Sequence, residues 1–210
     1  MRNLSSRIRI GSLEVNIITP EFLQYLKNTP NFCPQFHLSL QSGSDSVLKR
    51  MNRHYTSGEY LEKVDLIKKY FPLANITTDV IVGFAGETDE EFLQTVETCR
   101  RAGFGNMHIF PYSKRAGTMA YKLPVPPHDI VKNRIKQLEE VRHELTLEYY
   151  NKIANKDFEV LVEDKEDEYY VGYTENYVKV YLEEEVESNH FYKIKLLRPI
   201  KQGMLAQLIK

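Results

Sequence analysis

The sequence predicts an α/β protein in which part of a (β/α) barrel precedes a small antiparallel β-barrel. Three observations predict it. Up to about residue 120, strand-like and helix-like segments alternate; a long helical pattern then covers His128–Tyr150; and after Asn155 the apolar residues recur with a period of two. The 210 residues are enough for two small domains, and we place the boundary between residues 151 and 152.

Four segments of the first domain have the composition of strands: Arg7–Ser12, Phe36–Leu40, Ile76–Phe84 and Met107–Phe110. Because helical segments separate them, they are expected to form a parallel sheet. The third is rich in β-branched residues, which is typical of a strand that is buried on both faces. The sheet is small and its first strand has no predicted earlier neighbour, so we expect an uncovered edge at Arg7–Ser12. Such an edge favours self-association or a partner fragment.

Helix boundaries are readable from capping residues. Thr19 precedes a helix over Pro20–Lys27, with proline in the first helical position. A helix is also predicted over Ser57–Phe71. Thr88 and Glu91 form a capping box at the start of Thr88–Ala102, and Gly103 suits the position after its end.

The last 55 residues contain five short runs with strand periodicity, separated by acidic or Asn/Gly turns: FEVLVED, YYVGYTE, YVKVYLE, FYKIKLL and MLAQLIK. Five short strands at hairpin spacing predict a closed barrel of the OB-like size class.

Charge and cysteine content narrow the function classes. The net charge is −1; residues 1–150 carry 19 basic and 17 acidic residues, and residues 151–210 carry 9 and 12. Any contact with RNA must therefore be a local patch. Cys33 and Cys99 form no CxxC pair, and His37 and His108 are interpreted as packing or exposed residues, so no metal ligand is predicted. With no apolar run of membrane length and no signal peptide, we expect a cytoplasmic protein without a membrane partner.

Polar and glycine-rich residues follow all four predicted strands, at Gly11–Glu14, Gln41–Asp45, Gly83–Glu87 and Pro111–Thr118. Because ligands bind at the carboxyl ends of parallel strands, these ends predict a site. The glycines could equally be turn residues, and Asp45 and Thr88 could be helix caps only. Asp79 is more informative, because a carboxylate within an apolar strand needs a partner. Arg115, in a loop of small residues, is expected to face an anion.

Four motifs, in this order and at these spacings, resemble the radical S-adenosylmethionine tRNA methylthiotransferases: RIRIGSLE, HLSLQSGSDSVLKRMNRHYT, TTDVIVGFAGETDEEF and HIFPYSKRAGTMA. The final 60 residues resemble the TRAM domain of that family. Within them, GYTENYVKVYL favours the branch that acts on threonylcarbamoyladenosine.

The resemblance implies the C-terminal portion of a radical S-adenosylmethionine barrel, with tRNA as partner and S-adenosylmethionine as cofactor. In the family, [4Fe-4S] clusters cleave this cofactor to a 5′-deoxyadenosyl radical, and a methylthio group is installed at C2 of the adenosine next to the anticodon. The sequence lacks the CxxxCxxC cluster loop, and two isolated cysteines cannot supply three thiolates. The cluster-binding portion is therefore expected outside this sequence, and the chain alone is expected to be inactive. Ala85 stands where the family usually has proline.

The resemblance also suggests roles for residues near the strand ends. The ribose hydroxyls call for short polar groups, the carboxylate for a guanidinium, and the ammonium for a carboxylate. The adenine edge calls for strand-end backbone, such as Ile81–Gly83. The predicted cofactor-binding residues are Glu14 (ammonium), Ser39, Gln41 and Ser42 (ribose), Arg53 (carboxylate), Asp79, Gly83 and Arg115.

A patch on the second domain is the predicted RNA contact, because this domain is net acidic and offers few cations. It comprises Lys179, Lys193, Lys195, Arg198 and Tyr177, with Tyr173 as a further stacking group. The lysines could instead only keep a small barrel soluble, which would leave the basic loop Lys114–Lys122 as the RNA contact.

Three other functions remain open from the sequence: an RNA-binding module without catalysis, a methylthiotransferase acting on isopentenyladenosine, and an unrelated α/β enzyme with phosphate-binding loops. No P-loop, GxGxxG motif or nucleophile elbow favours the last of these. The sulfur donor and the oligomeric state are not readable from the residues.

Overall fold

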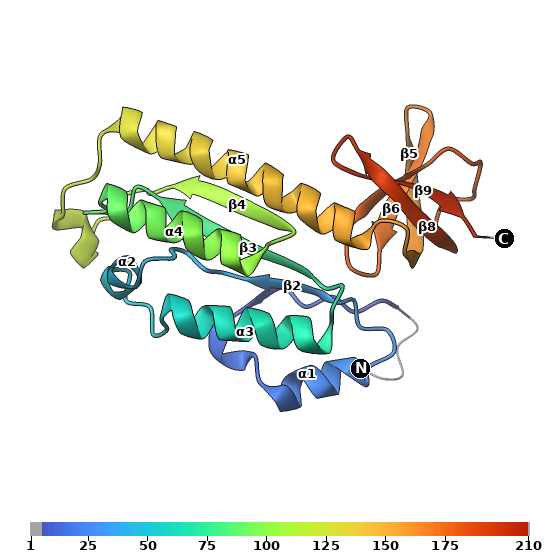
Figure 1. Cartoon of the computed structure of the whole chain (residues 1–210), viewed down its shortest axis with the longest axis horizontal. Coiled ribbons are helices and arrows are strands. Elements are labelled where there is room, and N and C mark those ends of the chain that lie inside the picture. Colours follow the sequence, from blue (N-terminus) through green and yellow to red (C-terminus); the bar gives the residue numbers. More distant parts are fainter. Residues whose placement is uncertain (1–5, 210) are drawn as a thin grey trace.

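The computed structural model describes residues 6–209. Its first part is a four-stranded parallel sheet in the order β1 (Ser12–Leu13), β2 (Gln35–Leu38), β3 (Asn75–Val82) and β4 (Asn106–Pro111). The strand order follows the chain order, as expected for successive right-handed β-α-β units. Figure 1 shows the sheet with helices packed along it and the C-terminal strands gathered at one end of the molecule.

The helices pack on one face of the sheet. They are α1 (Pro20–Lys27), α3 (Ser57–Tyr70), α4 (Asp89–Ala102) and α5 (His128–Ile153), and they share one hydrophobic core with the strands. A short helix α2 (Asp45–Arg50) follows β2, and 3-10 turns lie at Val15–Ile17 and Met119–Lys122. The opposite face of the sheet carries no helix in the described part of the chain, so it remains available to a ligand.

The side chains of β3 show how the two faces differ. Ile76, Val80 and Val82 belong to the core beneath the helices, whereas Thr77 and Asp79 line a cavity on the other face. This alternation follows from the period of two of a strand. The expectation that β3 is buried on both faces holds for its first half, where Ile76 and Thr77 are both buried, whereas Asp79 and Ile81 on the open face are only half-buried.

The predicted helix caps are present. Thr19 accepts a hydrogen bond from the amide of Phe22, and Thr88 and Glu91 form a complete capping box. Gly103 adopts the left-handed conformation, with φ of 59°, at the end of α4. These features depend only on residues within one turn, which is why sequence alone predicted them.

The second part is a closed barrel of β5 (Asp157–Glu166), β6 (Tyr169–Thr174), β7 (Lys179–Leu182), β9 (Gly203–Leu208) and β8 (His190–Ile200), in that spatial order. All five predicted strands are present. The barrel is not wholly antiparallel, however, since β7 pairs with β9 in parallel. β5, β6 and β7 pair antiparallel in turn, so β7 runs in the direction of β5. β8 is antiparallel to both β5 and β9, so β9 also runs in the direction of β5 and hence of β7.

The first strand differs most from its prediction. The expected strand over Arg7–Ser12 is reduced to Ser12–Leu13 and one isolated bridge between Ile8 and Phe32. Arg7 explains the difference, because its guanidinium donates to the carbonyl oxygens of Tyr173 and Glu159, at 2.9 and 2.7 Å. This segment is held by the barrel as well as by the sheet. Within residues 6–209, no strand pairs with the outer edge of β1.

Helix α5 joins the two parts and extends past the predicted boundary to Ile153. Tyr149 and Ile153, on its last turns, belong to the hydrophobic core of the barrel. Asn176 donates to the Tyr149 hydroxyl at 2.8 Å, and this hydroxyl donates to the carbonyl of Leu73 at 3.1 Å. Figure 1 shows the barrel at the end of the sheet opposite to α2. No described helix is both long enough and apolar enough to cross a membrane.

Candidate functional site

A cavity of about 990 Å³ lies at the carboxyl ends of the strands. Four of the eight predicted cofactor-binding residues line it: Gln41, Arg53, Asp79 and Arg115. Apolar walls come from Ile81 and Phe110, among others. An apolar cavity with a few convergent polar groups is the usual form of a small-molecule site, and here the polar groups include the guanidinium groups of Arg50, Arg53 and Arg115.

Gln41 enters this cavity from a strained backbone position. Its φ is 66°, which is uncommon for a residue with a side chain. Its amide donates to the carbonyl of Asp79 at 2.9 Å, and its carbonyl accepts from the amide of Ile81 at 2.8 Å. β3 therefore holds Gln41 in this conformation after β2 has ended. Such outliers persist where the surrounding structure over-determines them, often at ligand sites.

The other four predicted residues lie elsewhere. The Ser39 hydroxyl donates to Asp79 Oδ2 at 3.3 Å, so it supports a lining residue. Ser42 is fully buried, and its hydroxyl lies 3.2 Å from that of Thr95 on α4. Gly83 has φ of 75°, and a Cβ there would lie 2.6 Å from Val131 on α5. Glu14 is exposed and lines neither of the two cavities described in this section.

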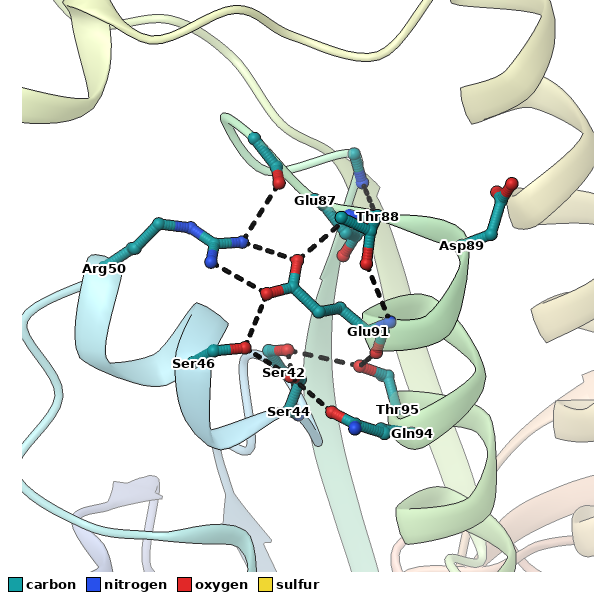
Figure 2. A network of polar contacts seen from close by, with 12 residues as sticks. Ser42, Ser44, Ser46, Arg50, Glu87, Thr88, Asp89, Glu91, Gln94 and Thr95 are labelled. Atoms are coloured by element: carbon teal, nitrogen blue, oxygen red, sulfur yellow. Dashed lines mark hydrogen bonds and ion pairs between the residues drawn. The ribbon is translucent and has the colours of Figure 1, made fainter.

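A polar network explains why so many small polar residues follow β2 (Figure 2). Ser42 contacts Thr95, the Ser44 hydroxyl donates to Gln94 Oε1 at 2.7 Å, and the Ser46 hydroxyl donates to Glu91 Oε1 at 2.5 Å. These bonds fasten the loop after β2 and the start of α2 to α4. Of the two serines predicted to bind a ribose, Ser42 therefore serves the packing against α4, whereas Ser39 supports Asp79.

Arg50 and Glu91 are the charged part of this network. Two parallel bonds join them, Nη1 to Oε1 at 2.8 Å and Nη2 to Oε2 at 2.7 Å. This pairing, with the Ser46 hydroxyl and the Thr88 amide, lowers the pKa of Glu91 to about 2. Arg50 is thus committed to α4, whereas Lys49 and Arg53, which also line the cavity, remain for an anionic ligand.

A buried ion pair that the sequence did not reveal lies beside the cavity. Arg134 of α5 donates to Glu87 Oε2 at 2.8 Å and to Asp89 Oδ1 at 2.7 Å. Glu87 also accepts from the amide of Gly83 at 2.8 Å. Burial raises the pKa of Glu87, although the Gly83 amide and Arg134 act in the opposite direction. The only sequence signal was an arginine on the otherwise apolar face of a helix.

A second cavity, of about 650 Å³, lies between the open face of the sheet and the barrel. The sheet contributes Gln35, His37, Thr77, Asp79 and His108, and the barrel contributes Tyr173, Tyr177, Lys179 and Gln202. Arg9, from the segment before β1, also lines this cavity. Asp79 and Phe110 line both cavities, so the two meet near the middle of the sheet.

His37, Asp79 and His108 form a cluster in this second cavity. His37 Nε2 lies 3.1 Å from Asp79 Oδ2, and His37 Nδ1 lies 3.0 Å from Thr77 Oγ1. Asp79 is the register partner of His108 on β4. The partner that the Asp79 carboxylate requires is therefore His37 on the neighbouring strand β2, and Ser39 is a second hydrogen-bond donor.

The predicted RNA-binding residues do not form one free patch. Tyr177 is stacked on Tyr173, with ring centroids 4.6 Å apart, and the Arg9 guanidinium lies 3.8 Å from its centroid. Lys179 pairs with Glu166 at 2.7 Å. Lys195 lies 3.8 Å from Asp157. Lys193 and Arg198 are exposed on β8, and the register places Lys193 opposite Glu159.

The cysteines do not fit an iron–sulfur cluster. Cys33 and Cys99 are both buried, and burial raises the pKa of the Cys33 thiol and raises that of Cys99 to about 12. A cluster needs thiolates that converge on its irons. The described part of the chain offers only two such thiols, which are too few for this role.

Comparison with known proteins identifies the superfamily. Residues 4–99 match the model of the radical SAM superfamily. A coproporphyrinogen III oxidase from Escherichia coli, described as a radical SAM enzyme, matches 66% of this chain and 32% of its own with a TM-score of 0.55. At 15% identity this likeness shows the fold alone.

Curated relatives narrow the match. The threonylcarbamoyladenosine tRNA methylthiotransferase MtaB of Bacillus subtilis is 36% identical over 97% of this chain and 48% of its own length. That of Thermotoga maritima is 38% identical over 82% of this chain and 40% of its own length. The tRNA-2-methylthio-N(6)-dimethylallyladenosine synthase of Mycobacteroides abscessus is 43% identical over 74% of this chain and 31% of its own length. The chain therefore belongs to the family of radical S-adenosylmethionine tRNA methylthiotransferases, and it spans about half the length of the first of these relatives.

Proposed function

We propose that the chain is the cofactor-binding and RNA-binding part of a tRNA methylthiotransferase that modifies C2 of threonylcarbamoyladenosine next to the anticodon. The five-stranded barrel would be its TRAM domain. The observation that carries the proposal is the pair of cavities that meet at Asp79, one at the strand ends and one facing the barrel. A cofactor in the first and a nucleoside in the second would come into contact at this residue.

The first cavity fits S-adenosylmethionine, which supplies the radical chemistry when it is bound. Arg53 and Arg115 present guanidinium groups for its carboxylate, and the Gln41 amide can hydrogen-bond a ribose hydroxyl. The side chains of Ile81 and Phe110 offer apolar surface for the adenine. Arg53 is preferred for the carboxylate because Arg50, three positions earlier, is already paired with Glu91.

The second cavity favours threonylcarbamoyladenosine over isopentenyladenosine, which is also called dimethylallyladenosine. A threonylcarbamoyl group carries a carboxylate and a hydroxyl, whereas a dimethylallyl group is a hydrocarbon. The cavity lining is rich in polar side chains, such as Gln35, Thr77 and His108, and includes the cation Arg9 and also Lys179, which is paired with Glu166. Burying a hydrocarbon against these groups would remove water from them without offering a hydrogen bond in return, which is costly.

The same cavity has an aromatic wall that suits a single-stranded RNA loop. Tyr173, Tyr177 and the Arg9 guanidinium form a stack within its lining. Proteins commonly bind unstacked bases on aromatic rings or on arginine planes. We infer that a loop nucleotide stacks on this surface while the modified adenosine enters the cavity.

Binding measurements with the chain test this proposal. Fluorescence anisotropy would compare two otherwise identical anticodon stem-loops, one with threonylcarbamoyladenosine and one with isopentenyladenosine. We expect tighter binding of the first, and Lys179→Ala with Arg9→Ala should reduce the difference. Equal affinity of the parent chain for both loops would reject the substrate assignment and leave an RNA-binding module without this selectivity.

The cofactor half of the proposal is tested separately. Equilibrium dialysis with radiolabelled S-adenosylmethionine should show binding that Arg53→Ala weakens, because a charge-assisted bond to the carboxylate is lost. Arg142→Ala, on the exposed surface of α5, is the matched control. If both variants bind as the parent does, Arg53 is not the carboxylate ligand.

The chain is expected to act together with a further portion that carries the clusters. The outer edge of β1 and the open face of the sheet are where such a portion would pack, since an unpaired strand edge readily accepts another segment. In its absence, this edge is expected to cause self-association.

A further inference from the structure

We propose that His37, Asp79 and His108 bind a divalent transition-metal ion, with zinc as the best fit, on the open face of the sheet. Their ligand atoms all lie within 4.8 Å of one another. Neither the family match nor the relatives' names assign such a site. The proposal does not depend on the proposed function, because it concerns three side chains of the chain itself.

The donor set is suited to such an ion. Two imidazoles and one carboxylate are the ligands of several catalytic zinc sites and of non-haem iron sites. Imidazole nitrogen discriminates against magnesium and calcium, which prefer oxygen ligands. Three protein ligands leave at least one coordination position open, and here that position would face the cavity between the sheet and the barrel.

The hydrogen bonds around His37 prepare its Nε2 for a metal. Thr77 Oγ1 accepts from Gln35 Nε2 at 3.0 Å and lies 3.0 Å from His37 Nδ1. If Nδ1 donates to this oxygen, Nε2 carries the lone pair and faces Asp79 Oδ2 at 3.1 Å. Two acceptors at this distance need a proton or a metal ion between them. Metal-binding histidines typically donate their second nitrogen in this way.

The geometry requires only a small movement. Tetrahedral ligands at about 2.1 Å from zinc lie roughly 3.4 Å apart, which the His37–Asp79 pair already approaches at 3.1 Å. His37 and Asp79 are mostly buried, with side-chain exposures of 15% and 28%, so two ligands are held in place. His108 is exposed, and rotation of its ring would bring the third nitrogen closer.

The alternative is a hydrogen-bonded pair without a metal, in which His37 Nε2 carries the proton and donates it to Asp79. That arrangement does not involve His108. The two readings therefore differ in one residue, because only the metal site needs His108 as a ligand.

Isothermal titration of the chelator-treated chain with Zn²⁺ tests the proposal, and Co²⁺ absorption reports the coordination geometry. We expect stoichiometric binding at micromolar concentrations and the visible bands of a site with nitrogen and oxygen ligands. His108→Ala should weaken binding by about tenfold or more, and Thr77→Val by about tenfold through lost orientation of His37. Circular dichroism would confirm that each variant is folded.

His190→Ala is the matched control, because this exposed histidine lies beside Glu187 and outside the cavity. It should leave Zn²⁺ binding unchanged. The proposal is overturned if the parent chain binds no Zn²⁺ at millimolar concentration. It is also overturned if folded His108→Ala binds as tightly as the parent, which would leave His37 and Asp79 as a hydrogen-bonded pair.

Discussion

Arg134 Nη1 on α5 lies 2.8 Å from Glu87 Oε2, and the two side chains are only 6% and 1% exposed. Glu87 lies in the loop between β3 and α4, and α5 carries the barrel at its other end. This pair therefore fixes the angle of α5 relative to the cavity at the strand ends. Helix α5 thus contacts the loop after β3 through Arg134 and the barrel core through its last turns.

Arg134→Met should destabilise the chain strongly. Removing one partner of a buried pair leaves an uncompensated charge, which typically costs about 3–5 kcal/mol. Arg142→Met is the control, since Arg142 forms an exposed pair with Glu139 and should cost about 1 kcal/mol or less. Urea denaturation of both variants provides the comparison. Similar losses in the two would show that the buried pair does not hold α5.

Glu91 should make stability depend on acid. Its pKa is lowered to about 2 from the ordinary 4.5, so its contribution is fully present above pH 4.5 and is lost as the pH falls toward 2. Glu91→Gln should therefore be least stable relative to the parent at neutral pH, and the difference should shrink toward pH 2. Thermal melts across this range measure it. Glu97→Gln, at an exposed position on the same helix, should show no such convergence.

Gly83 should not tolerate a side chain. Its φ is 75° and a Cβ would lie 2.6 Å from Val131 Cγ2, so Gly83→Ala is expected to lose about 1–3 kcal/mol. Gly58 is the contrasting position, because its added Cβ would meet nothing closer than 3.9 Å and it lies within α3. Gly58→Ala should be neutral or stabilising by up to about 1 kcal/mol. Equal effects of the two changes would contradict the close packing of α5 on Gly83.

Much of the fold was predictable because it depends on local patterns. The ends of α1 and α4 follow from Thr19, Thr88 and Gly103, each within one turn of the helix end that it caps. The five barrel strands follow from their period of two. The parallel pairing of β7 with β9 was missed, because pairing depends on how the strands close the barrel and not on their own residues.

The site was less predictable, because strand ends carry residues of two kinds. Gln41 and Arg53 line a cavity, whereas Ser42 and Gly83 pack against α4 and α5. All four have suitable chemistry, and only the position of helices distant in sequence separates them. The stack of Arg9 on Tyr177 was also missed, since it joins residues at opposite ends of the chain.

The basic residues of β8 give a prediction about RNA. If Lys193 and Lys195 contact phosphates, replacing both by alanine in the complete enzyme should weaken tRNA binding. The slope of log K against log salt should fall by up to about one unit per lost contact. Lys136→Ala, at an exposed position on α5, serves as the control. Because Asp157 and Glu159 lie opposite these lysines, an unchanged slope would leave Lys114–Lys122 as the RNA contact.

The central claim is that this sequence belongs to an enzyme acting on threonylcarbamoyladenosine in tRNA. Mass spectrometry of tRNA nucleosides, from cells with and without the gene that encodes it, tests this claim most directly. We predict that deletion removes the 2-methylthio derivative of threonylcarbamoyladenosine, leaves that of isopentenyladenosine, and is complemented by the intact gene but not by one carrying Arg53→Ala. Persistence of the first derivative, or loss of the second alone, would contradict the account.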